Sequence, residues 1–458
     1  MIEMATLAIG VIAAAMVLCL SPLRGLVVYI AVLAWYPSFL AVPIGTIDLT
    51  VTRIVMLALF VKLFLHRGAT EQSRFVIIDK LIIIYFVCQI LAGVFTVDSL
   101  AQFLENRAGA AFDMVLPYFA VRLIIQDKQQ YLSLLKSILV ISVPLAVFGV
   151  WECLTGENPF AFLWSYYAWA TDVEFTPMHR SGLFRAKVVF PHPIMYGLFF
   201  AMFGPVCVGL LRQPRQKRRL YYAGLVVMGI GVFASMSSGP ALTLMLAISF
   251  ILFYKHRKSW RLVVGIAVVM CLVVEVASNR HFYDVLGRFT FNSGTAWYRS
   301  RLFEVAFFDG GMSGHWLAGF GQADPGWGPR IDMRDFTDIV NHYVLVLVRY
   351  GLIGLIPFIA ILIAISKRLA GALRICISEE ERWLVWCVTA SLFGLLGGIF
   401  SVSLFGQPIV LFYMIMGFSV AMPNIMGKKM IRCVRRKGSA RNLTACEANL
   451  NRSDYDDR

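Results

Sequence analysis

Long apolar runs recur along the whole chain and constrain its fold more than any other feature. Most hold about 17 to 25 residues, enough for a helix to cross a hydrocarbon core of about 30 Å. Hydrophobic residues make up 59% of the 458 residues, and charged residues only 15%. A soluble core explains one or two such runs, but not a dozen. In lipid only helices and closed barrels satisfy the backbone. The runs are continuous rather than alternating, so they predict helices.

The sequence therefore predicts an all-α membrane protein that crosses the bilayer about 12 or 13 times, with the count near the N-terminus left open. The expected spans are 4–20, 24–43, 48–65, 80–96, 108–124, 132–151, 188–211, 220–236, 240–254, 261–277, 340–366, 383–402 and 406–426. The nine cysteines are scattered, without a Cys-x-x-Cys pair or close Cys/His spacing. We therefore expect no metal site.

Basic residues concentrate in short segments next to the apolar runs. These segments are 212–219, 255–261, 367–374 and 428–437. Because cytoplasmic loops are rich in Lys and Arg, we assign all four segments to the cytoplasm. Residues 1–426 then form the transmembrane domain, and 427–458 form a basic cytoplasmic tail that we expect to be disordered. The loops account for the net charge of +15, so we do not expect nucleic acid as a partner.

Two long connections fall on the opposite, outer face, at about 152–187 and 278–339. Loops of this length are usually functional. The first leads into HRSGLFRAKVVFPHPIMYG at 179–197, where Arg185 is a candidate to hold a phosphate through its planar guanidinium. We expect Arg180 and Lys187 to lie at the lipid interface, and His192 to fix the entry into a helix.

Two further motifs lie on the same face. SMSSGP at 235–240 predicts a tight hairpin, after which a helix begins. Either the hydroxyl and N–H groups of this segment face an anion, or the segment is a plain turn. SGTAWYRSRLFEV at 293–305 predicts an amphipathic helix lying on the membrane. Arg299 and Arg301 are two apart on this helix, so at most one of them should serve a site. GFGQADPGWGP at 319–329 is a Gly/Pro turn cluster.

The stretch DIVNHYVLVLVRYGLIG at 338–354 places ionisable residues at the start of an apolar helix. Asp338 and His342 are four apart, which predicts one helix face, and Arg349 follows two turns deeper on that face. A charged group within a span costs at least about 2.5 kcal/mol, so such groups usually face a water-filled cavity. A neutral histidine there can act as a general base near pH 7. The alternatives are a core histidine and an arginine that pairs with a carbonyl group.

The order of these motifs resembles the O-antigen ligase and O-antigen polymerase superfamily of bacterial inner-membrane glycosyltransferases. The resemblance is carried by LFRAKVVFPHPIMYG at 183–197, SMSSGPALTL at 235–244, GTAWYRSRLFEVA at 294–306, GFG at 319–321 and VNHYVLVLVRYGLIG at 340–354. It implies a multi-helix fold of the GT-C type in the inner membrane. It also implies an active site on the periplasmic face and a cytoplasmic C-terminus.

The resemblance implies transfer of a glycan from undecaprenyl diphosphate to a sugar hydroxyl, without metal or other cofactor. It places the diphosphate on Arg185 and Arg299, with Arg301 and Arg349 as further candidates. It suggests His342 as the base, with Asp338 to orient it. The family's His-Asn pair falls on Val340 and Asn341, however, so Asp338, His315 or catalysis by the arginines alone stays open.

The implied partners are a lipid-linked oligosaccharide donor, a glycan or lipid-linked acceptor, membrane lipid and other polysaccharide export proteins. The spelling of the first motif favours a polymerase of a surface or exported polysaccharide over a ligase that transfers a finished glycan to a lipid. A transporter or flippase is the rival from another class. It predicts charges near the midplane of several spans and a repeat between halves, whereas the ionisable groups here concentrate at one face.

Overall fold

The computed structural model describes residues 2–44, 47–65, 75–97, 99–166, 175–212, 218–277, 293–376 and 378–426. The structure is mostly helical, with 76% helix and 3% strand. Seven of the described helices are long and apolar enough to cross a membrane. These findings confirm a helical fold and fit a multi-pass membrane protein. The predicted tail at 427–458 lies outside the described residues.

The elements follow one another along the chain as a series of long helices with two small hairpins. The N-terminal part holds α1 (Ile2–Cys19), α2 (Pro22–Trp35), β1 (Ala41–Ile44), β2 (Ile47–Thr50), α3 (Val51–Leu65), α4 (Ile77–Val94), α5 (Leu100–Ala110), the π-helix η2 (Ala111–Val115) and α6 (Leu116–Ile124). The middle part holds α7 (Lys128–Thr155), η3 (Ala161–Tyr166), β3 (His179–Arg180), β4 (Leu183–Phe184), α8 (Pro193–Cys207), η4 (Val208–Arg212), α9 (Arg218–Ala234), α10 (Ser238–Leu252), η6 (Phe253–Ser259) and α11 (Trp260–Ala277). The C-terminal part holds α13 (Ser293–Phe307), α14 (Gly328–Ile331), α15 (His342–Ile375), α16 (Glu379–Gly398) and α17 (Gln407–Met426).

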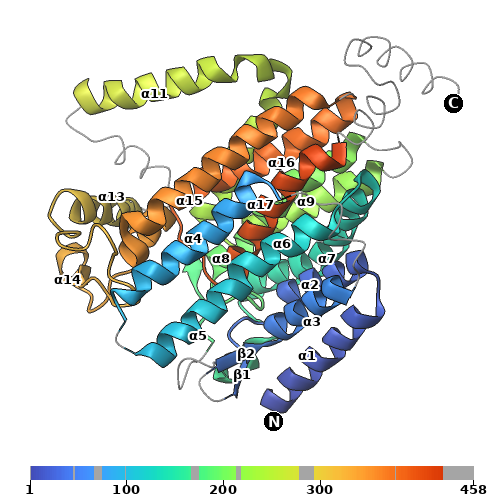
Figure 1. Cartoon of the computed structure of the whole chain (residues 1–458), viewed down its shortest axis with the longest axis horizontal. Coiled ribbons are helices and arrows are strands. Elements are labelled where there is room, and N and C mark those ends of the chain that lie inside the picture. The colour runs from blue at the N-terminus through green and yellow to red at the C-terminus, as the bar shows by residue number, and fades with distance from the viewer. Residues whose placement is uncertain are drawn as a thin grey trace, which may run out of the picture.

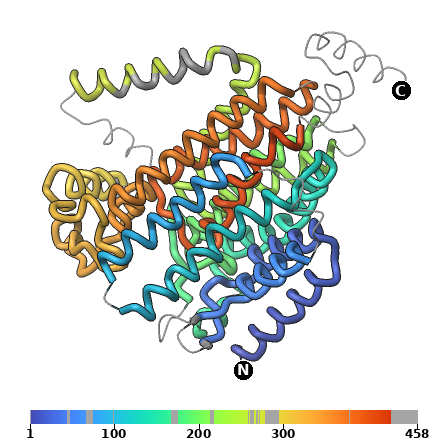
Figure 2. The backbone as a smooth tube through the Cα atoms, in the orientation of Figure 1, coloured from blue at the N-terminus to red at the C-terminus, as the bar shows by residue number. Residues whose placement is uncertain are grey.

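Most of the long helices run side by side as one bundle (Figure 1). Helices α8 and α17 form its centre, since 83% of the residues in each apolar segment are buried. Helix α17 packs against α6 and α15, and α15 packs against α4. The tube in Figure 2 shows α13 and α14 gathered beyond the start of α15, and α11 standing apart from the bundle. The described part of the second connection therefore lies at the end of the bundle where α15 begins.

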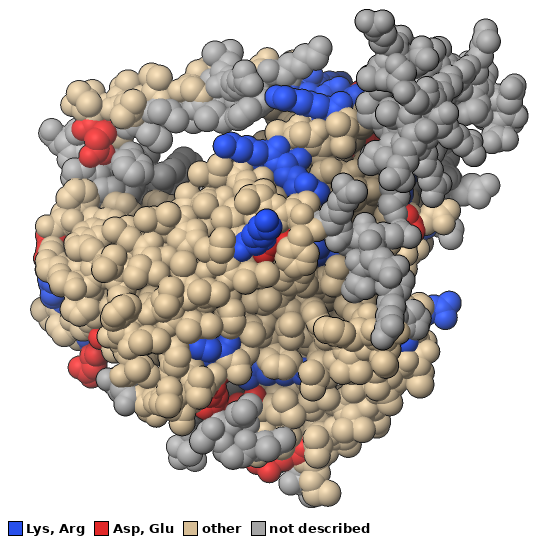
Figure 3. Space-filling model, in the orientation of Figure 1, with Lys and Arg blue, Asp and Glu red and all other residues tan. Residues whose placement is uncertain are grey.

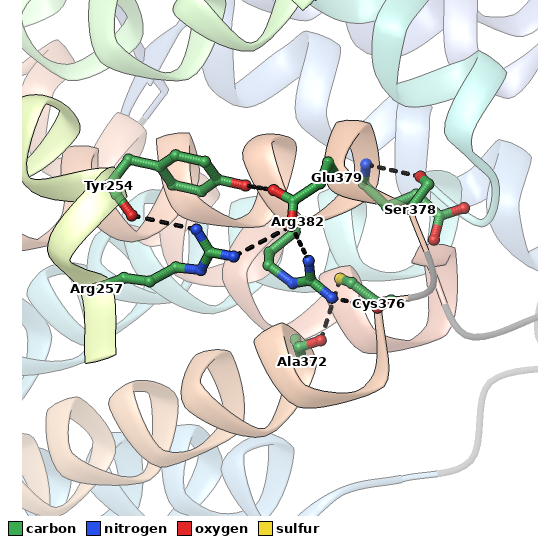
Figure 4. A network of polar contacts seen from close by, with 8 residues as sticks. Tyr254, Arg257, Ala372, Cys376, Ser378, Glu379 and Arg382 are labelled. Carbon is green, nitrogen blue, oxygen red and sulfur yellow. Dashed lines mark hydrogen bonds and ion pairs between the residues drawn. The ribbon is translucent and has the colours of Figure 1, made fainter.

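The other end of the bundle carries the described residues of three basic segments, at the end of η4, in η6 and in the last turns of α15, and we call it the basic end. There the guanidinium group of Arg212 lies over the rings of Tyr254 and Trp383. Glu379 accepts hydrogen bonds from Tyr254, Arg257 and Arg382, which come from two different segments (Figure 4). Figure 3 shows the largest Lys and Arg patches on the upper part of one face, above broad uncharged areas.

Three predicted boundaries need correction. The span expected at 340–366 continues as α15 to Ile375, so the basic segment at 367–374 is helical. The span expected at 24–43 ends as a helix at Trp35, because Tyr36 precedes Pro37 and adopts extended angles (φ −103°, ψ 126°). The chain then enters the β1–β2 hairpin. The span expected at 108–124 begins at Leu100 and runs through η2 into α6. The helix expected at 293–305 is confirmed as α13, and the hairpin expected at 235–240 joins α9 to α10.

Candidate functional site

The β3–β4 hairpin brings two arginines to the end of the bundle opposite the basic end. Its turn residues Ser181 and Gly182 both have positive φ. Arg180 pairs with Leu183 in the hairpin, and Arg185 follows it directly. The next backbone N–H, that of Ala186, donates to the carbonyl of Ala234 at the end of α9 (2.9 Å). The hairpin is thereby fixed to the turn between α9 and α10.

That turn receives both guanidinium groups. Nη2 of Arg185 donates to Oγ of Ser237 at 2.9 Å, and Nη1 of Arg180 donates to the carbonyl of Met236 at 3.1 Å. Ser237 is the N-cap residue of α10, and its hydroxyl donates to the carbonyl of Ser235 instead of accepting from the helix. The first N–H groups of α10 therefore lie close to Arg185 without a side-chain cap.

Arg299 on α13 joins the two arginines, although it is 114 residues beyond Arg185. Burial, followed by the positive charge of Arg180, lowers the pKa of Arg185 and of Arg299 to about 10 each. The charge of Arg180 contributes to both shifts, so Arg180 lies within electrostatic range of Arg185 and of Arg299. We call Arg180, Arg185 and Arg299 the arginine cluster.

The arginine cluster lacks a counter-charge. Among the described residues, no carboxylate forms an ion pair with any of its members. Nε of Arg185 and Nε of Arg299 are buried and have no hydrogen-bond partner. Both residues are half-buried, and guanidinium groups that lose part of their contact with water are normally paired. The cluster therefore has the donors and the charge to bind an anion with several oxygen atoms.

Neighbouring basic residues have structural roles. Lys187 is buried, with Nζ over the rings of Trp164 (4.6 Å) and Phe175 (4.3 Å), so its expected place at the lipid interface is wrong. Nδ1 of His192 accepts the N–H of Ile194 (3.2 Å) and caps α8, as expected. Burial, with the charges of the surrounding cations, lowers the pKa of His192 to about 4. The ring is therefore neutral and serves as a cap.

Arg301 lies apart from the arginine cluster. Nη1 of Arg301 forms ion pairs with Glu304 at 2.9 Å and with Asp309 at 2.8 Å, and its Nε donates to the carbonyl of Arg330. The helical period of α13 turns it away from Arg299, in line with the expectation that only one of the two faces a site. Its pairing does not support the suggested contact with a diphosphate.

The expected pairing of Asp338 with His342 along a helix is wrong. Helix α15 begins at His342, with the side chain of Asn341 accepting from the N–H groups of Tyr343 and Val344. Asp338 precedes the helix, so a spacing of four does not place the two side chains on one face. Instead, the hydroxyl of Tyr298 on α13 bonds to the backbone of Asp338.

His342 is buried and has a defined partner. Its Nδ1 accepts the backbone N–H of Leu404 at 3.2 Å, and its ring packs edge-on against Phe358 and Phe412. When Nδ1 of a neutral imidazole accepts, the proton sits on Nε2, which then donates. This geometry presents a hydrogen-bond donor and does not support His342 as a base. His315 is exposed and stacks on Phe320 at 3.9 Å.

Asp338 and Arg349 line one chamber of about 350 Å³ beside α15. Asp338 is exposed, but partial desolvation by the surrounding protein raises its pKa; the charge of Arg334 opposes the shift, and that of Asp332 adds to it. A carboxyl group with a raised pKa is a stronger base once ionised. Of the suggested bases, Asp338 is therefore placed best.

Arg349 also lines a second, adjoining cavity of about 370 Å³ between α3, α4, α5 and α15, which we call the central cavity. His342 lines it as well. The cavity wall carries charged residues that come from several segments of the chain. These are Asp48, Arg53, Glu105, Arg107, Asp113 and Arg349. The sequence analysis missed Arg53 and Arg107, although both lie at the edge of apolar runs, where a charge is a usable signal.

A break in α15 holds Arg349 in place. Gly351 has φ 58° and ψ −159°, which interrupts the helix. The Gly/Pro-rich loop supplies the missing bonds, since Phe320 N–H donates to the carbonyl of Val348 (2.6 Å) and Leu352 N–H donates to the carbonyl of Trp316 (2.8 Å). Broken helices occur in membranes where the freed groups are satisfied by protein. The turn cluster at 319–329 is therefore part of the wall beside Arg349.

No protein-family model matches the chain, and no curated protein matches it either.

Proposed function

We propose that this protein is a membrane glycosyltransferase that moves a glycan from a polyprenyl diphosphate to a sugar hydroxyl, and that it thereby polymerises the repeat units of a surface or exported polysaccharide. The observation that carries the proposal is the arginine cluster. Arg185 and Arg299 come from separate connections and have buried Nε atoms without partners. A diphosphate offers the oxygen atoms and the negative charge that such a site lacks.

The reaction needs little beyond charge and position. The oxygen of the acceptor hydroxyl forms a bond to the anomeric carbon of the donor, and the bond from that carbon to the diphosphate oxygen breaks. Negative charge then grows on the diphosphate, where the guanidinium groups of the arginine cluster stabilise it. The hydroxyl proton passes to the carboxylate of Asp338. Tyr298, which holds the backbone of Asp338, is the residue before Arg299.

The proposed site faces away from the cytoplasm. The arginine cluster lies at the end of the bundle opposite the basic end, and loops rich in Lys and Arg are usually cytoplasmic. We therefore place the reaction at the periplasmic face of a bacterial inner membrane, where a lipid-linked donor and acceptor can meet. The GT-C resemblance is part of this proposal.

Complementation of a deletion strain tests the proposal. The variants are Arg185→Gln and Arg299→Gln, with Arg301→Gln as the matched control two residues away on α13. Membrane levels of each are checked, and lipid-linked intermediates and surface polysaccharide are separated on gels. We expect the first two variants to accumulate single lipid-linked repeat units and the control to behave as the wild type.

Other outcomes have distinct meanings. Long lipid-linked chains in the deletion strain would show a ligase that transfers finished glycan. Normal polysaccharide in the deletion strain would refute a glycosyltransferase and favour transport. Binding of farnesyl diphosphate by the purified protein gives a second readout. Loss of one charged hydrogen-bond donor should weaken it by about 10-fold or more.

A further inference from the structure

The central cavity contains a buried arginine that the proposed reaction does not use. Arg107 on α5 is 7% exposed. Its hydrogen bonds among the described residues go to neutral groups at long distances, Oε1 of Gln89 at 3.3 Å and the hydroxyl of Tyr350 at 3.4 Å. Its Nε is buried without a partner. No carboxylate forms an ion pair with it in the part of the chain that the structure describes.

Two other arginines within the bundle each have a carboxylate partner. Arg122 on α6 is 3% exposed and has Asp79 at 3.7 Å. Arg53, on the wall of the same cavity, has Asp113 at 3.4 Å.

The guanidinium of Arg107 lies near the rings of Phe103 (5.9 Å) and Tyr350 (5.3 Å), which offset only part of the cost of its burial. A buried cation without a carboxylate partner is expensive, so its retention in a membrane bundle indicates a functional place. Arg107 therefore points to a ligand that completes its hydrogen bonds.

The rest of the wall indicates the chemistry of this ligand. Three carboxylates of the wall, on Asp48, Glu105 and Asp113, equal its three arginines in number, so a simple anion is not favoured over a neutral polar molecule. The wall also carries amides and phenols, which are Gln89, Asn106, Gln322, Tyr85, Tyr350 and Tyr413. Such a lining offers many donors and acceptors and several ring surfaces. This combination fits the hydroxyl groups and ring faces of a glycan.

The cavity also lies beside the arginine cluster. The connection from α16 to α17 separates them, since Val402 lies against Gly239 near the start of α10, while Leu404 and Phe405 line the cavity. Gly406 of the same connection approaches Pro191, which precedes the α8 cap. A ligand in the cavity and a diphosphate on the cluster would thus be held on two sides of one short segment.

We propose that the central cavity binds the glycan of the acceptor and that Arg107 is its buried hydrogen-bond donor. This inference rests on the proposed function, because the donor occupies the arginine cluster. It assigns separate arginines to the two substrates. Arg185 and Arg299 serve the diphosphate of the donor, and Arg107 serves sugar oxygens of the acceptor.

Binding by the full chain in lipid nanodiscs tests this assignment with two probes. Farnesyl diphosphate reports on the donor site, and oligosaccharide fragments of the source cell's own surface polysaccharide report on the acceptor site. We expect Arg107→Met to weaken oligosaccharide binding by about 10-fold or more, with farnesyl diphosphate affinity within about two-fold of the wild type. Arg185→Gln should show the reverse pattern, and Arg257→Gln at the basic end should change neither.

Each failure can be told apart. If Arg107→Met binds the oligosaccharide as tightly as the wild type while Arg185→Gln loses farnesyl diphosphate, the acceptor site is wrong and the proposed function stands. If the wild type binds no farnesyl diphosphate, both proposals are overturned. If Arg107→Met does not fold, Arg107→Lys replaces it, because lysine keeps the charge without the planar fork. Unchanged oligosaccharide binding by that variant would overturn the inference.

Discussion

Replacing Gly351 with alanine tests whether the break in α15 is a required part of the wall beside Arg349. At φ 58° and ψ −159°, Gly351 occupies a region that is open almost only to glycine. A side chain there costs about 1 to 3 kcal/mol in backbone strain alone. A Cβ atom would also lie 2.1 Å from the carbonyl oxygen of Leu317, a backbone atom that cannot move by itself.

The clash adds to the strain. The segment around Leu317 must shift, and its backbone bonds to α15 then break. These are Phe320 N–H to the carbonyl of Val348, Leu352 N–H to the carbonyl of Trp316, and Ile353 N–H to the carbonyl of Leu317. Each contributes about 1 kcal/mol net. With the strain, we expect Gly351→Ala to destabilise the protein by about 4 to 6 kcal/mol.

Thermal unfolding in detergent, followed by tryptophan fluorescence, measures the effect. Gly371→Ala is the matched control on the same helix, because Gly371 is exposed and has open space at its Cβ position. The control should be neutral or stabilise slightly, since alanine favours helix over glycine by about 1 kcal/mol. Gly319→Ala meets the carbonyl of Val348 at 2.4 Å from the loop side. Its effect should therefore not add to that of Gly351→Ala. Equal unfolding temperatures for Gly351→Ala and Gly371→Ala would refute the reasoning.

Three further outcomes are expected. Asp338→Asn should lower the transfer rate by about 100-fold or more. In the wild type, transfer should fall as the pH drops through the raised pKa of Asp338, and Asp332→Asn should move that fall to lower pH; an unchanged pH profile would exclude Asp338 as the base. The pKa of His192 is about 4 in the folded state, against about 6.5 in the unfolded chain. The contribution of the neutral ring to the free energy of unfolding is therefore complete above about pH 6.5, and it should decline by up to about 3 kcal/mol as the pH falls toward 4. His192→Asn, which keeps a cap but does not titrate, should remove that decline in a pH series of unfolding temperatures. Asn341→Ala should cost about 1 kcal/mol of stability through the lost N-cap of α15, and Asn341→Ser should restore most of it.

Much of the fold could be predicted from local patterns. Continuous apolar runs gave most helices within a few residues, because length and hydropathy act within each segment. The helical period correctly separated Arg299 from Arg301, and the Pro-His-Pro spelling correctly predicted a cap at His192. The errors arose where a single residue inside or beside an apolar run set the end of the helix. Pro37 ended α2 early, and Asn341 capped α15 so that Asp338 fell outside the helix.

Only part of the candidate site could be predicted from such local patterns. The sequence singled out Arg185, Arg299 and Arg349, because a charge near an apolar run is costly wherever the chain folds. Which arginine has a counter-charge was decided only by tertiary structure, since Arg53 meets Asp113 from another helix, whereas Arg107 has no carboxylate in an ion pair among the described residues. The role of His342 was also hidden, because its Nδ1 partner lies 62 residues away at Leu404.

The sequence by itself determined that this protein is built from apolar helices, because each run must bury its own backbone in lipid regardless of its neighbours. It also predicted that the two long connections carry candidate binding residues, among them Arg185 and Arg299. The tertiary structure alone decided that, among the described residues, Arg180, Arg185 and Arg299 have no carboxylate in an ion pair, and that the break at Gly351 is filled by a distant loop. Electrostatic pairing and close packing depend on distances between segments, and sequence spacing does not contain those distances.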